Sequence, residues 1–410
     1  MKKLFLYFIS FLLIFLVSFV FVPEAKNTLS RKKILIVTSR GGGGHISASN
    51  ALESYFKDRF DIKTVKLLEE VLSPIDAFQD LTFGKYSYED LYNYFLKERL
   101  TFFINIVASK SNWYISSFSK SIENLIKQYF FKENPDIIIS VIPLFNQQLL
   151  NVSKELNIPL ILVTVDLDTI NYVRNFNNIN YDKFFYTIVF DDDLIKDKLK
   201  NLNLNSNQLK VVGFPIRKDF FEVKDINLIK KEFSLPFNKQ IIMILMGATG
   251  SCASINYLKE ISKLNLDAHI IICTGRDDNL KDKLKKVNLS ENLTISIIGF
   301  TDRISDLMAV SDCIITKPGP TSISEALYLN KPIIVDYTCS PVFWEKLNID
   351  FIEKHNFGFV ISCLSDLKIF LPKILDKKYN SEVVNRIKVF EKRNPIQEIS
   401  NLINRLILID

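Results

Sequence analysis

A run of four glycines followed by a histidine is the first place where this sequence could bind an anion. Residues 41–45 read GGGGH, directly after the apolar segment 33–38 and before a segment with a helical pattern. Glycine lets backbone N–H groups approach an anion closely, and a helix N-terminus adds positive potential. The turn is neither a G-x-G-x-x-G fingerprint nor a Walker A loop, because no Gly-Lys-Ser/Thr follows. We interpret it as a phosphate-binding turn between a strand and a helix.

The histidine sharpens this interpretation because the residue is rare in this chain, which has three: His45, His269 and His355. His269 begins an apolar segment and is interpreted as structural. At the mouth of a cleft, His45 has the chemistry to take a proton from a hydroxyl or to pair with a phosphate. Capping of the helix is the alternative role for His45.

A second segment has the pattern of a phosphate site. Residues 316–326 read TKPGPTSISEA and follow the apolar segment 312–316. Hydroxyl side chains in the first turn of a helix, together with its N-terminal N–H groups, suit a phosphate. Glu325, one turn further, can accept hydrogen bonds from two vicinal hydroxyls such as those of ribose. Simple N-capping would explain Thr321 and Ser322, but not the Lys-Pro-Gly-Pro before them.

Short apolar segments that alternate with helical patterns must position both sites. Such Ile/Val-rich runs are typical of buried parallel strands with crossover helices. They occur at 33–38, 136–141, 160–165, 186–190, 241–246, 269–273, 294–298, 312–316 and 332–336. The pattern predicts an α/β fold of two doubly wound, Rossmann-like domains that face each other across a cleft, at 31–220 and 221–410. A phosphate site on each domain predicts a nucleoside diphosphate that bridges the cleft.

The start of the chain bears on its location. Leu4 to Val22 are 19 consecutive residues without a charge, which as a helix would cross a bilayer. We expect residues 1–30 to form an uncleaved membrane anchor rather than a cleavable signal peptide, because the apolar stretch is long and its cleavage site is poor. Both flanks of this stretch are basic, so the excess of positive charge expected on the cytoplasmic side leaves the orientation of the anchor open. Five widely spaced cysteines without a C-x-x-C pair favour reduced thiols, and hence a catalytic body on the cytoplasmic side.

The segment 83–131 does not resemble a standard crossover, because 14 of its 49 residues are aromatic, against 12% for the whole chain. Lysines and arginines are interleaved with the aromatic residues. The segment is either a helical subdomain with an aromatic core or a surface that enters lipid headgroups. Stacking on nucleic-acid bases is a third interpretation, which the small net charge of +6 disfavours. That charge fits weak attraction to anionic lipid.

The segment 299–360 resembles the C-terminal half of the monogalactosyldiacylglycerol synthase and processive diacylglycerol glucosyltransferase family. These are UDP-sugar-dependent enzymes of GT-B fold in glycosyltransferase family 28. The residues that carry the resemblance are Gly299-Phe300-Thr301, 312–317 (DCIITK), Gly319-Pro320, 324–327 (SEAL), Pro332-Ile333-Ile334 and Glu345-x-x-Asn348. Upstream, 38–48, 143–146, Thr164 with Asp166-Leu167, 213–217 and Gly275-Arg276 fall in family order. The resemblance extends over 32–362 and implies the GT-B fold.

The resemblance also implies roles for individual residues. UDP would be bound mainly by the C-terminal domain, with Phe300 beside the uracil, Ser322 and neighbouring N–H groups on the diphosphate, and Glu325 on the ribose. Glu345 and Asn348 would contact the sugar. His45 would be the catalytic residue, and Asp166 would lie on the acceptor side. The full set of expected donor-binding residues is Gly43, Gly44, Gly247, Arg276, Phe300, Lys317, Gly319, Pro320, Ser322, Glu325, Glu345 and Asn348.

The chain departs from the family at several positions. Arg40 stands where an acidic or amide residue is usual, Thr321 where glycine is usual, Trp344 where glutamine is usual, and Ile142 where histidine is usual. The glycine-rich loop after the first strand of the second domain is shortened to 246–251. A tryptophan can stack on a sugar ring or block its pocket, so the resemblance leaves glucose and galactose both open as the donated sugar.

The implied activity is inverting transfer of a hexose from a UDP-sugar to diacylglycerol or glycosyl-diacylglycerol at the membrane. Residues 191–193 (DDD) contain a formal D-x-D pattern, but we interpret them as the acidic start of a helix. We therefore expect no metal, with helix termini, Lys317 and Arg276 in place of a cation. No cofactor beyond the UDP-sugar co-substrate and no nucleic-acid partner are expected.

Three alternatives to this activity stay open. The first is transfer of N-acetylglucosamine from its UDP-sugar to a polyprenyl-linked acceptor. The second is epimerisation of UDP-N-acetylglucosamine, which uses the same fold but acts on a soluble sugar and needs no anchor. The third is a membrane-tethered protein that binds a UDP-sugar without catalysis.

Overall fold

The computed structural model describes residues 31–407 except 99, 174–175, 177–178, 201–206 and 248–249. Residues 33–410 form one compact unit. The apolar segment 4–22 lies outside the described residues, so its assignment as an anchor stays a prediction. Among the described residues, no helix is both long enough and apolar enough to span a bilayer.

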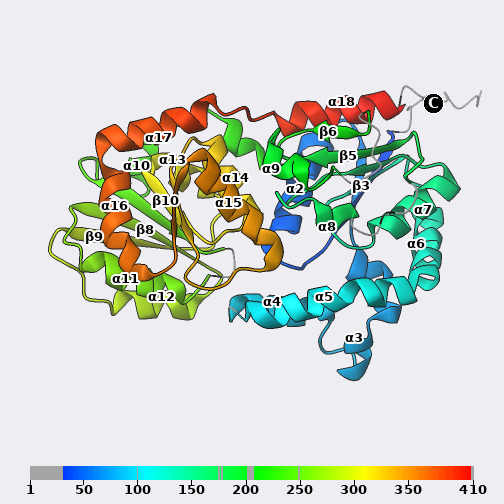
Figure 1. The fold of residues 1–410 in the computed structure, drawn as a ribbon, viewed down its shortest axis with the longest axis horizontal. Coiled ribbons are helices and arrows are strands. Elements are labelled where there is room, and N and C mark those ends of the chain that lie inside the picture. The colour runs from blue at the N-terminus through cyan, green and yellow to red at the C-terminus, as the bar shows by residue number, and fades with distance from the viewer. Residues whose placement is uncertain are drawn as a thin grey trace, which may run out of the picture. The chain divides into compact units, whose positions relative to one another are not determined.

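The first half of the unit is built on a parallel sheet of six strands (Figure 1). The strands are β1 (Lys33–Thr38), β2 (Asp61–Lys66), β3 (Ile137–Ser140), β4 (Leu160–Leu162), β5 (Phe184–Ile188) and β6 (Leu209–Val211). Their order across the sheet is β2-β1-β3-β4-β5-β6. In the register of the first two pairs, Ile36 of β1 lies opposite Thr64 of β2 and Ile139 of β3.

The second half repeats this design with a different strand order. Its strands are β7 (Gln240–Leu245), β8 (Ala268–Gly275), β9 (Leu293–Gly299), β10 (Cys313–Thr316), β11 (Ile333–Asp336) and β12 (Gly358–Ile361), arranged as β12-β11-β10-β7-β8-β9. Strand β7 shows why both faces must be covered by helices. Its residues alternate between two hydrophobic clusters, with Ile242 and Ile244 in one and Ile241 and Met243 in the other.

Helices lie between the strands along the chain, and most of them cover the faces of the two sheets, as a parallel sheet requires. In the first half they are α2 (Gly43–Phe56), η1 (Leu67–Val71), η2 (Ser73–Ile75), α3 (Ala77–Leu81), α4 (Tyr88–Lys97), α5 (Thr101–Ser117), α6 (Ser119–Glu133), α7 (Asn146–Leu156), α8 (Ile170–Val173) and α9 (Asp193–Asp197). In the second half they are η3 (Lys218–Phe221), α10 (Ile226–Glu232), α11 (Ala253–Ser262), α12 (Asp278–Lys285), α13 (Ile304–Val310), α14 (Pro320–Tyr328), η4 (Phe343–Glu345), α15 (Lys346–His355), η5 (Leu364–Asp366), α16 (Leu367–Leu375), α17 (Lys377–Val389) and α18 (Pro395–Ile407).

The prediction of two doubly wound parallel sheets is confirmed, and all nine apolar segments overlap strands. Three strands were not predicted: β2, β6 and β12. Each of them is at an edge of its sheet. Both strand orders reverse direction once, between β1 and β3 in the first sheet and between β7 and β10 in the second. Ligands of open α/β sheets bind at such switch points, beyond the carboxyl ends of the strands.

The C-terminal helix α18 belongs in space with the first half of the unit. Arg59 donates hydrogen bonds to Ser400 Oγ at 2.8 Å and to Asn404 Oδ1 at 2.9 Å, and Arg405 lies over the ring of Phe185. Figure 1 shows α18 beside β5 and β6. The predicted range 221–410 therefore includes a helix that packs on the other half, while the predicted domain limits themselves stay a prediction.

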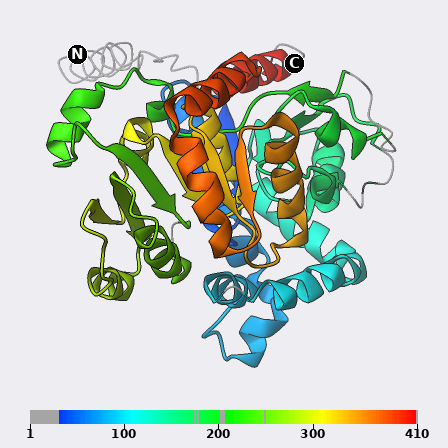
Figure 2. The same ribbon diagram turned by 60° about the vertical axis from the view of Figure 1, so that its left-hand side comes forward.

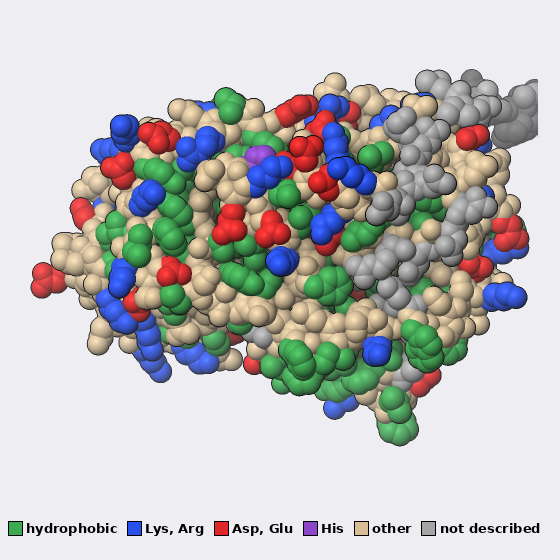
Figure 3. All heavy atoms as spheres, viewed as in Figure 1, with side chains coloured by type: hydrophobic (Ala, Val, Ile, Leu, Met, Phe, Trp, Pro, Cys, Tyr) green, Lys and Arg blue, Asp and Glu red, His purple; other side chains and the backbone are tan. Residues whose placement is uncertain are grey.

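Helices α3, α4 and α5, between β2 and β3, project together away from the first sheet in both ribbon views (Figure 2). Part of their aromatic content packs internally, as where Phe95 stacks on Phe103 with ring centroids 5.7 Å apart. Much of the rest is exposed, and Figure 3 shows hydrophobic side chains gathered over α4 and α5. We call this surface the insertion face; its exposed large apolar residues are Leu81, Phe83, Tyr86, Tyr88, Tyr94, Leu100, Phe102, Phe103, Ile106, Val107, Trp113 and Phe118.

Position 213 must be glycine because the backbone of the C-terminal segment passes close to it. Gly213 has a φ of 85°, and a Cβ there would lie 2.4 Å from both Arg393 O and Tyr328 Oη. Gly84 has a φ of 77° with no atom within 4 Å of a Cβ, so it is a matched control. Both alanine variants should lose about 1 kcal/mol through backbone strain, and Gly213→Ala about 1–3 kcal/mol more through the clash. Denaturant unfolding checks this, and equal losses would contradict it.

Candidate functional site

Two helix N-termini from different halves of the unit face each other. Helix α2 begins after Gly42 and α14 after Gly319, and glycine has no side chain to satisfy the first N–H groups of either helix. A Cβ at Gly44 would lie 2.9 Å from Thr321 Oγ1, so the first turns of α2 and α14 are adjacent. Donors and positive potential from both helices therefore converge, as an anion of two phosphates requires.

The ring of His45, at the start of α2, is fixed by a hydrogen bond across the switch point of the first sheet. Nδ1 lies 2.8 Å from the carbonyl oxygen of Val141, directly after β3. A carbonyl oxygen only accepts, so Nδ1 carries the proton and Nε2 keeps its lone pair. Burial lowers the pKa of His45 from 6.5 to about 4, against the opposing effect of the Val141 hydrogen bond. His45 is therefore a neutral imidazole whose Nε2 can accept a proton.

A tyrosine links Asp166 to the same carbonyl oxygen, that of Val141. The Tyr172 hydroxyl lies 3.3 Å from Asp166 Oδ2 and 3.4 Å from Val141 O. Burial first, and then the nearby Glu345 carboxylate, raise the pKa of Asp166 well above its usual value. The structure thus brings Asp166, predicted on the acceptor side, close to Glu345 of the other half, and it favours the protonated form of the Asp166 carboxyl.

The switch point of the second sheet holds a lysine. The chain passes Gly247 after β7 and Lys317 after β10, and a Cβ at Gly247 or Gly319 would lie 3.5 or 3.2 Å from Lys317 Cε. Lys317 Nζ is 3.7 Å from Glu345 Oε1. The two glycines therefore leave room for the lysine to lie over the start of α14, with its ammonium beside the predicted sugar-contacting carboxylate.

Asn348 supports this loop from behind. Its side chain is fully buried, and its amide donates to the carbonyl oxygen of Pro318 at 2.7 Å. The structure therefore places Asn348 where it positions the segment from Lys317 to Gly319, while Glu345 is the member of the predicted pair that faces Lys317. Its Oδ1 is buried and has no hydrogen-bond partner among the described residues, so the predicted sugar contact of Asn348 stays a prediction.

The remaining predicted donor-binding residues lie in two places: on α14 itself and in the loops after β8 and β9. Pro320 is the first residue of α14 and Ser322 is half-buried in its first turn, while Glu325 is buried in its second turn. Burial raises the pKa of Glu325 to about 8, against the lowering effect of Arg217. After β8 and β9, the Arg276 guanidinium lies 4.5 Å from the centre of the Phe300 ring, which is 60% exposed. An exposed ring of this kind is a platform for stacking.

Residues 191–193 lie at a helix start, as predicted. Asp192 is the N-cap of α9, and its carboxylate accepts from Leu194 N at 2.8 Å. The same carboxylate binds Lys354 at 3.1 Å and His355 at 2.7 Å, from α15 of the other half. Across the described residues, no group of three or more His, Cys, Asp or Glu side chains is arranged to hold a metal.

The departures from the family pattern have structural partners. The Arg40 guanidinium lies 2.9 Å from Glu69 and 3.3 Å from Asp90, so it faces η1 and α4 rather than α14. Trp344, in η4, is half-buried and packs edge-on against Phe343 with ring centroids 4.8 Å apart.

Three residues of α4 at this site were not predicted. Glu89 and Asn93 hydrogen-bond to the turn that precedes α2, and the ring of Tyr92 lies 3.5 Å from the Cβ position of Gly41. Burial, and then Glu345 and Asp166, raise the pKa of Tyr92. The spacing of Ser87 and Asp90, which form a capping box, marks the start of α4 in the sequence but not its partner.

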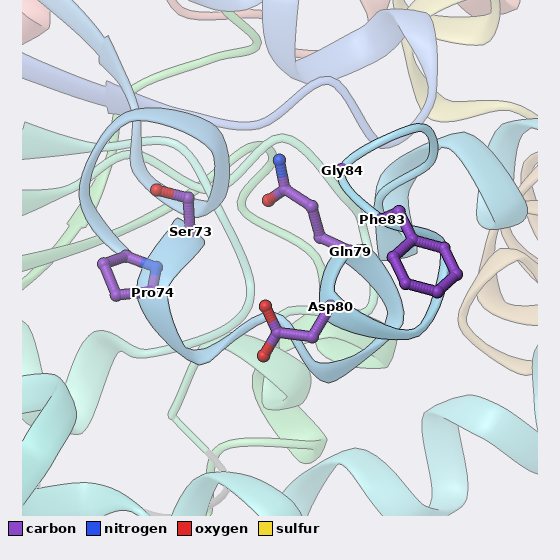
Figure 4. A pocket seen from close by; sticks show the side chains of 6 residues that line it. All are labelled: Ser73, Pro74, Gln79, Asp80, Phe83 and Gly84. Carbon is purple, nitrogen blue, oxygen red and sulfur yellow. The ribbon is translucent and has the colours of Figure 1, made fainter.

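A cavity of about 400 Å³ lies between η2 and the end of α3 (Figure 4). Its lining residues come from η2, α3 and the turn after α3: Ser73, Pro74, Gln79, Asp80, Phe83 and Gly84. None of them is a predicted site residue, and the cavity is separate from the pair of helix N-termini described above.

The low pKa of His45 predicts its titration. With three histidines in the chain, ring Cε1 proton signals are few enough to follow by NMR, and His45→Gln assigns one. That signal should titrate near pH 4 rather than 6.5. The unfolded chain takes up this proton at the higher pH, so the free energy of unfolding should fall as the pH drops from 6.5 to 4. A midpoint near 6.5 in the folded protein would contradict this environment.

Comparison with known proteins adds names to this geometry. Residues 45–216 match the model of monogalactosyldiacylglycerol (MGDG) synthase, and residues 241–335 match the glycosyltransferase family 28 C-terminal domain. Similar relatives include a processive diacylglycerol beta-glucosyltransferase of Bacillus pumilus, 28% identical over 82% of this chain and 85% of the relative. The protein of the same name from Bacillus subtilis is 26% identical over 81% of this chain and 84% of the relative.

Solved structures show the fold. MurG of Acinetobacter baumannii matches with a TM-score of 0.59 at 11% identity, over 92% of this chain and 99% of that one. The glycosyltransferase SnogD of Streptomyces nogalater matches with a TM-score of 0.57 at 13% identity, over 92% and 100%. The fold is thus the GT-B-like one. Residues 45–216 thus match a monogalactosyldiacylglycerol synthase domain and residues 241–335 a glycosyltransferase family 28 C-terminal domain, and together with relatives named processive diacylglycerol beta-glucosyltransferase they identify the chain as a glycosyltransferase.

Proposed function

We propose that this protein transfers a hexose from a UDP-sugar to the hydroxyl of diacylglycerol or glycosyl-diacylglycerol, with inversion and without a metal. The observation that carries the proposal is His45, whose unprotonated Nε2 stands at the start of a helix that faces a second helix N-terminus. A base and an anion site side by side are what the transfer of a sugar from a diphosphate needs. The names of the relatives supply the lipid acceptor.

The donor would lie along the second half of the site. The uracil ring stacks on the exposed Phe300, the ribose hydroxyls bind Glu325, and the diphosphate lies at the N-terminus of α14 beside Lys317. The pKa of Glu325, raised to about 8 by burial, keeps this carboxyl protonated below that pH, so it can both donate to and accept from hydroxyls. The sugar then reaches Glu345, which is beside Lys317 and near Asp166.

The chemical step would use His45 and both helix N-termini. His45 Nε2 takes the proton of the acceptor hydroxyl while that oxygen forms a bond to the anomeric carbon. The bond from this carbon to the UDP oxygen breaks on the opposite face, and UDP leaves with the electron pair, so the configuration inverts. N–H groups of α2 and α14, together with Lys317, would stabilise the leaving diphosphate in place of a cation. The diphosphate charge also raises the low pKa of His45, which makes it a better base when the donor is bound.

The insertion face would hold the protein at the lipid surface. Phe102 and Trp113 are 70% and 72% exposed, and they are 11 residues apart on α5, close to three helical turns. A soluble surface rarely carries so many exposed aromatic residues together, and such a surface suits the boundary of headgroups and acyl chains. With the predicted anchor at 1–30 and the net charge of +6, it supports a body on the cytoplasmic leaflet, where UDP-sugars are available.

One experiment tests the whole proposal: release of UDP from UDP-glucose or UDP-galactose by the full chain with diacylglycerol vesicles. We expect release that depends on diacylglycerol, continues in EDTA, and gives a glycolipid whose headgroup identifies the sugar and the number transferred. Release only with UDP-N-acetylglucosamine and a polyprenyl-linked acceptor would replace the proposal by that activity. Binding of UDP without any release would support a non-catalytic binder.

Replacement of His45 should separate chemistry from binding. His45→Ala removes the base but leaves the second half of the site intact, so kcat should fall by about 100-fold or more. The affinity for UDP, measured by calorimetry, should change less than about threefold. His269→Gln is the matched control, because His269 is bonded to Thr294 and Ser296 within the second sheet. Full turnover in His45→Ala would remove His45 from the reaction.

Replacement on the insertion face should impair turnover only at a lipid surface. In the double variant Phe102→Ser, Trp113→Ser, the lost apolar area should lower kcat/KM for diacylglycerol in vesicles by about tenfold. Turnover of a short-chain, monomeric diacylglycerol should be unchanged. Phe237→Ser, at a phenylalanine of the other half that is 62% exposed, is the control. Equal losses with both acceptors would show that the face does not act through the membrane.

A further inference from the structure

Helix α4 is bonded to the turn that carries the glycines. Glu89 is 4% exposed, and one of its oxygens, Oε1, accepts three hydrogen bonds from consecutive residues. The donors are Ser39 Oγ at 2.5 Å, Arg40 N at 2.7 Å and Gly41 N at 3.2 Å. A carboxylate that gathers backbone N–H groups in this way fixes the path of the turn.

Asn93, one helical turn after Glu89, completes the attachment. Its Oδ1 accepts from Gly42 N at 2.9 Å, and its Nδ2 donates to Arg40 O at 3.0 Å. Residues i and i+4 of a helix lie on one face, so Glu89 and Asn93 together hold every residue from 39 to 42. Gly42 has a φ of 73°, a conformation that the turn does not adopt by strand or helix propensity.

The attached turn is directly continuous with the reacting groups. Gly43 and Gly44 supply the first N–H groups of α2, and His45 follows in the same helical turn. Donor groups and a base act efficiently only when they are held at the reacting geometry, and a displacement of about 1 Å can cost about 100-fold in rate. Three of the predicted UDP-binding residues, Phe300, Glu325 and Lys317, lie outside α4 in the second half, so the bonds from α4 to the turn do not involve them.

We propose that Glu89 and Asn93 are positioning residues for the sugar transfer: they hold residues 39–42 so that the N-terminus of α2 and His45 Nε2 meet the diphosphate and the acceptor hydroxyl. This inference rests on the proposed function. It assigns to α4, which also carries part of the insertion face, an effect on kcat that neither the family models nor the relatives' names assign.

Kinetics on the full chain test the proposal with Glu89→Ala, Glu89→Gln and Asn93→Ala. Glu98→Ala is the matched control, because Glu98 ends the same helix and is exposed. We expect Glu89→Ala to lower kcat at least about tenfold, with KM for the UDP-sugar and the affinity for UDP within twofold of the parent. Glu89→Gln keeps an acceptor oxygen and should recover part of the loss, and Glu98→Ala should be unchanged.

A second readout does not depend on turnover. Amide hydrogen exchange, followed by mass spectrometry, should be faster at residues 39–45 in Glu89→Ala and in Asn93→Ala, and unchanged in Glu98→Ala. If the parent protein transfers no sugar to diacylglycerol, the proposed function fails, while exchange still decides whether α4 orders the turn.

Three results would overturn the inference. The first is a kcat equal to the parent in Glu89→Ala and Asn93→Ala. The second is unchanged exchange at residues 39–45. The third is a parallel loss of kcat, UDP affinity and thermal stability, which would give these residues a merely structural role. Should Glu89→Ala fail to fold, Glu89→Gln and Asn93→Ala carry the same comparison.

Discussion

The hydrogen bond between His45 Nδ1 and the Val141 carbonyl oxygen is the constraint on which the site depends. It joins the helix after β1 to the end of β3, across the point where the strand order of the first sheet reverses. Because a carbonyl oxygen only accepts, this single contact sets the tautomer, the ring orientation and the free lone pair together. The Tyr172 hydroxyl at the same oxygen extends the constraint to Asp166.

The second half repeats this arrangement at its own switch point, with a lysine in place of the histidine. Lys317 lies at the switch point between β7 and β10, over two glycines that leave it room. A parallel sheet leaves its carboxyl-end loops free where neighbouring crossovers diverge. Each half therefore provides an uncovered helix N-terminus, and the two termini are adjacent, because a Cβ at Gly44 would lie 2.9 Å from Thr321 Oγ1.

The central architecture could be predicted from the sequence because buried parallel strands are continuous apolar runs, such as residues 241–246. Three of the four edge strands, β2, β6 and β12, could not, whereas the fourth, β9, was predicted from the apolar run 294–298. β2 reads DIKTVK, and β6 has three residues, since an edge strand is covered on fewer sides and needs fewer apolar residues. Glu89 and Asn93 were missed for a different reason: all but one of their partners in the turn are backbone atoms 48 to 53 positions away, and no side-chain pattern records such bonds. Asn348 was predicted as a sugar contact, and only the structure shows that its amide donates to the carbonyl oxygen of Pro318.

Helix α4 has one face exposed at the surface and another that is bonded to the glycine turn. Tyr94 is 56% exposed on the insertion face, whereas its neighbour Asn93 holds the glycine turn. Residues three or four positions apart share a face of a helix, so the ten residues of α4 divide between one face that bonds the glycine turn and another that is exposed. A change of the exposed face therefore leaves the glycine turn intact only if it spares Glu89 and Asn93. A chimaera that exchanges the whole segment would replace the exposed apolar surface and, in the same step, remove the hydrogen bonds that hold the turn before His45.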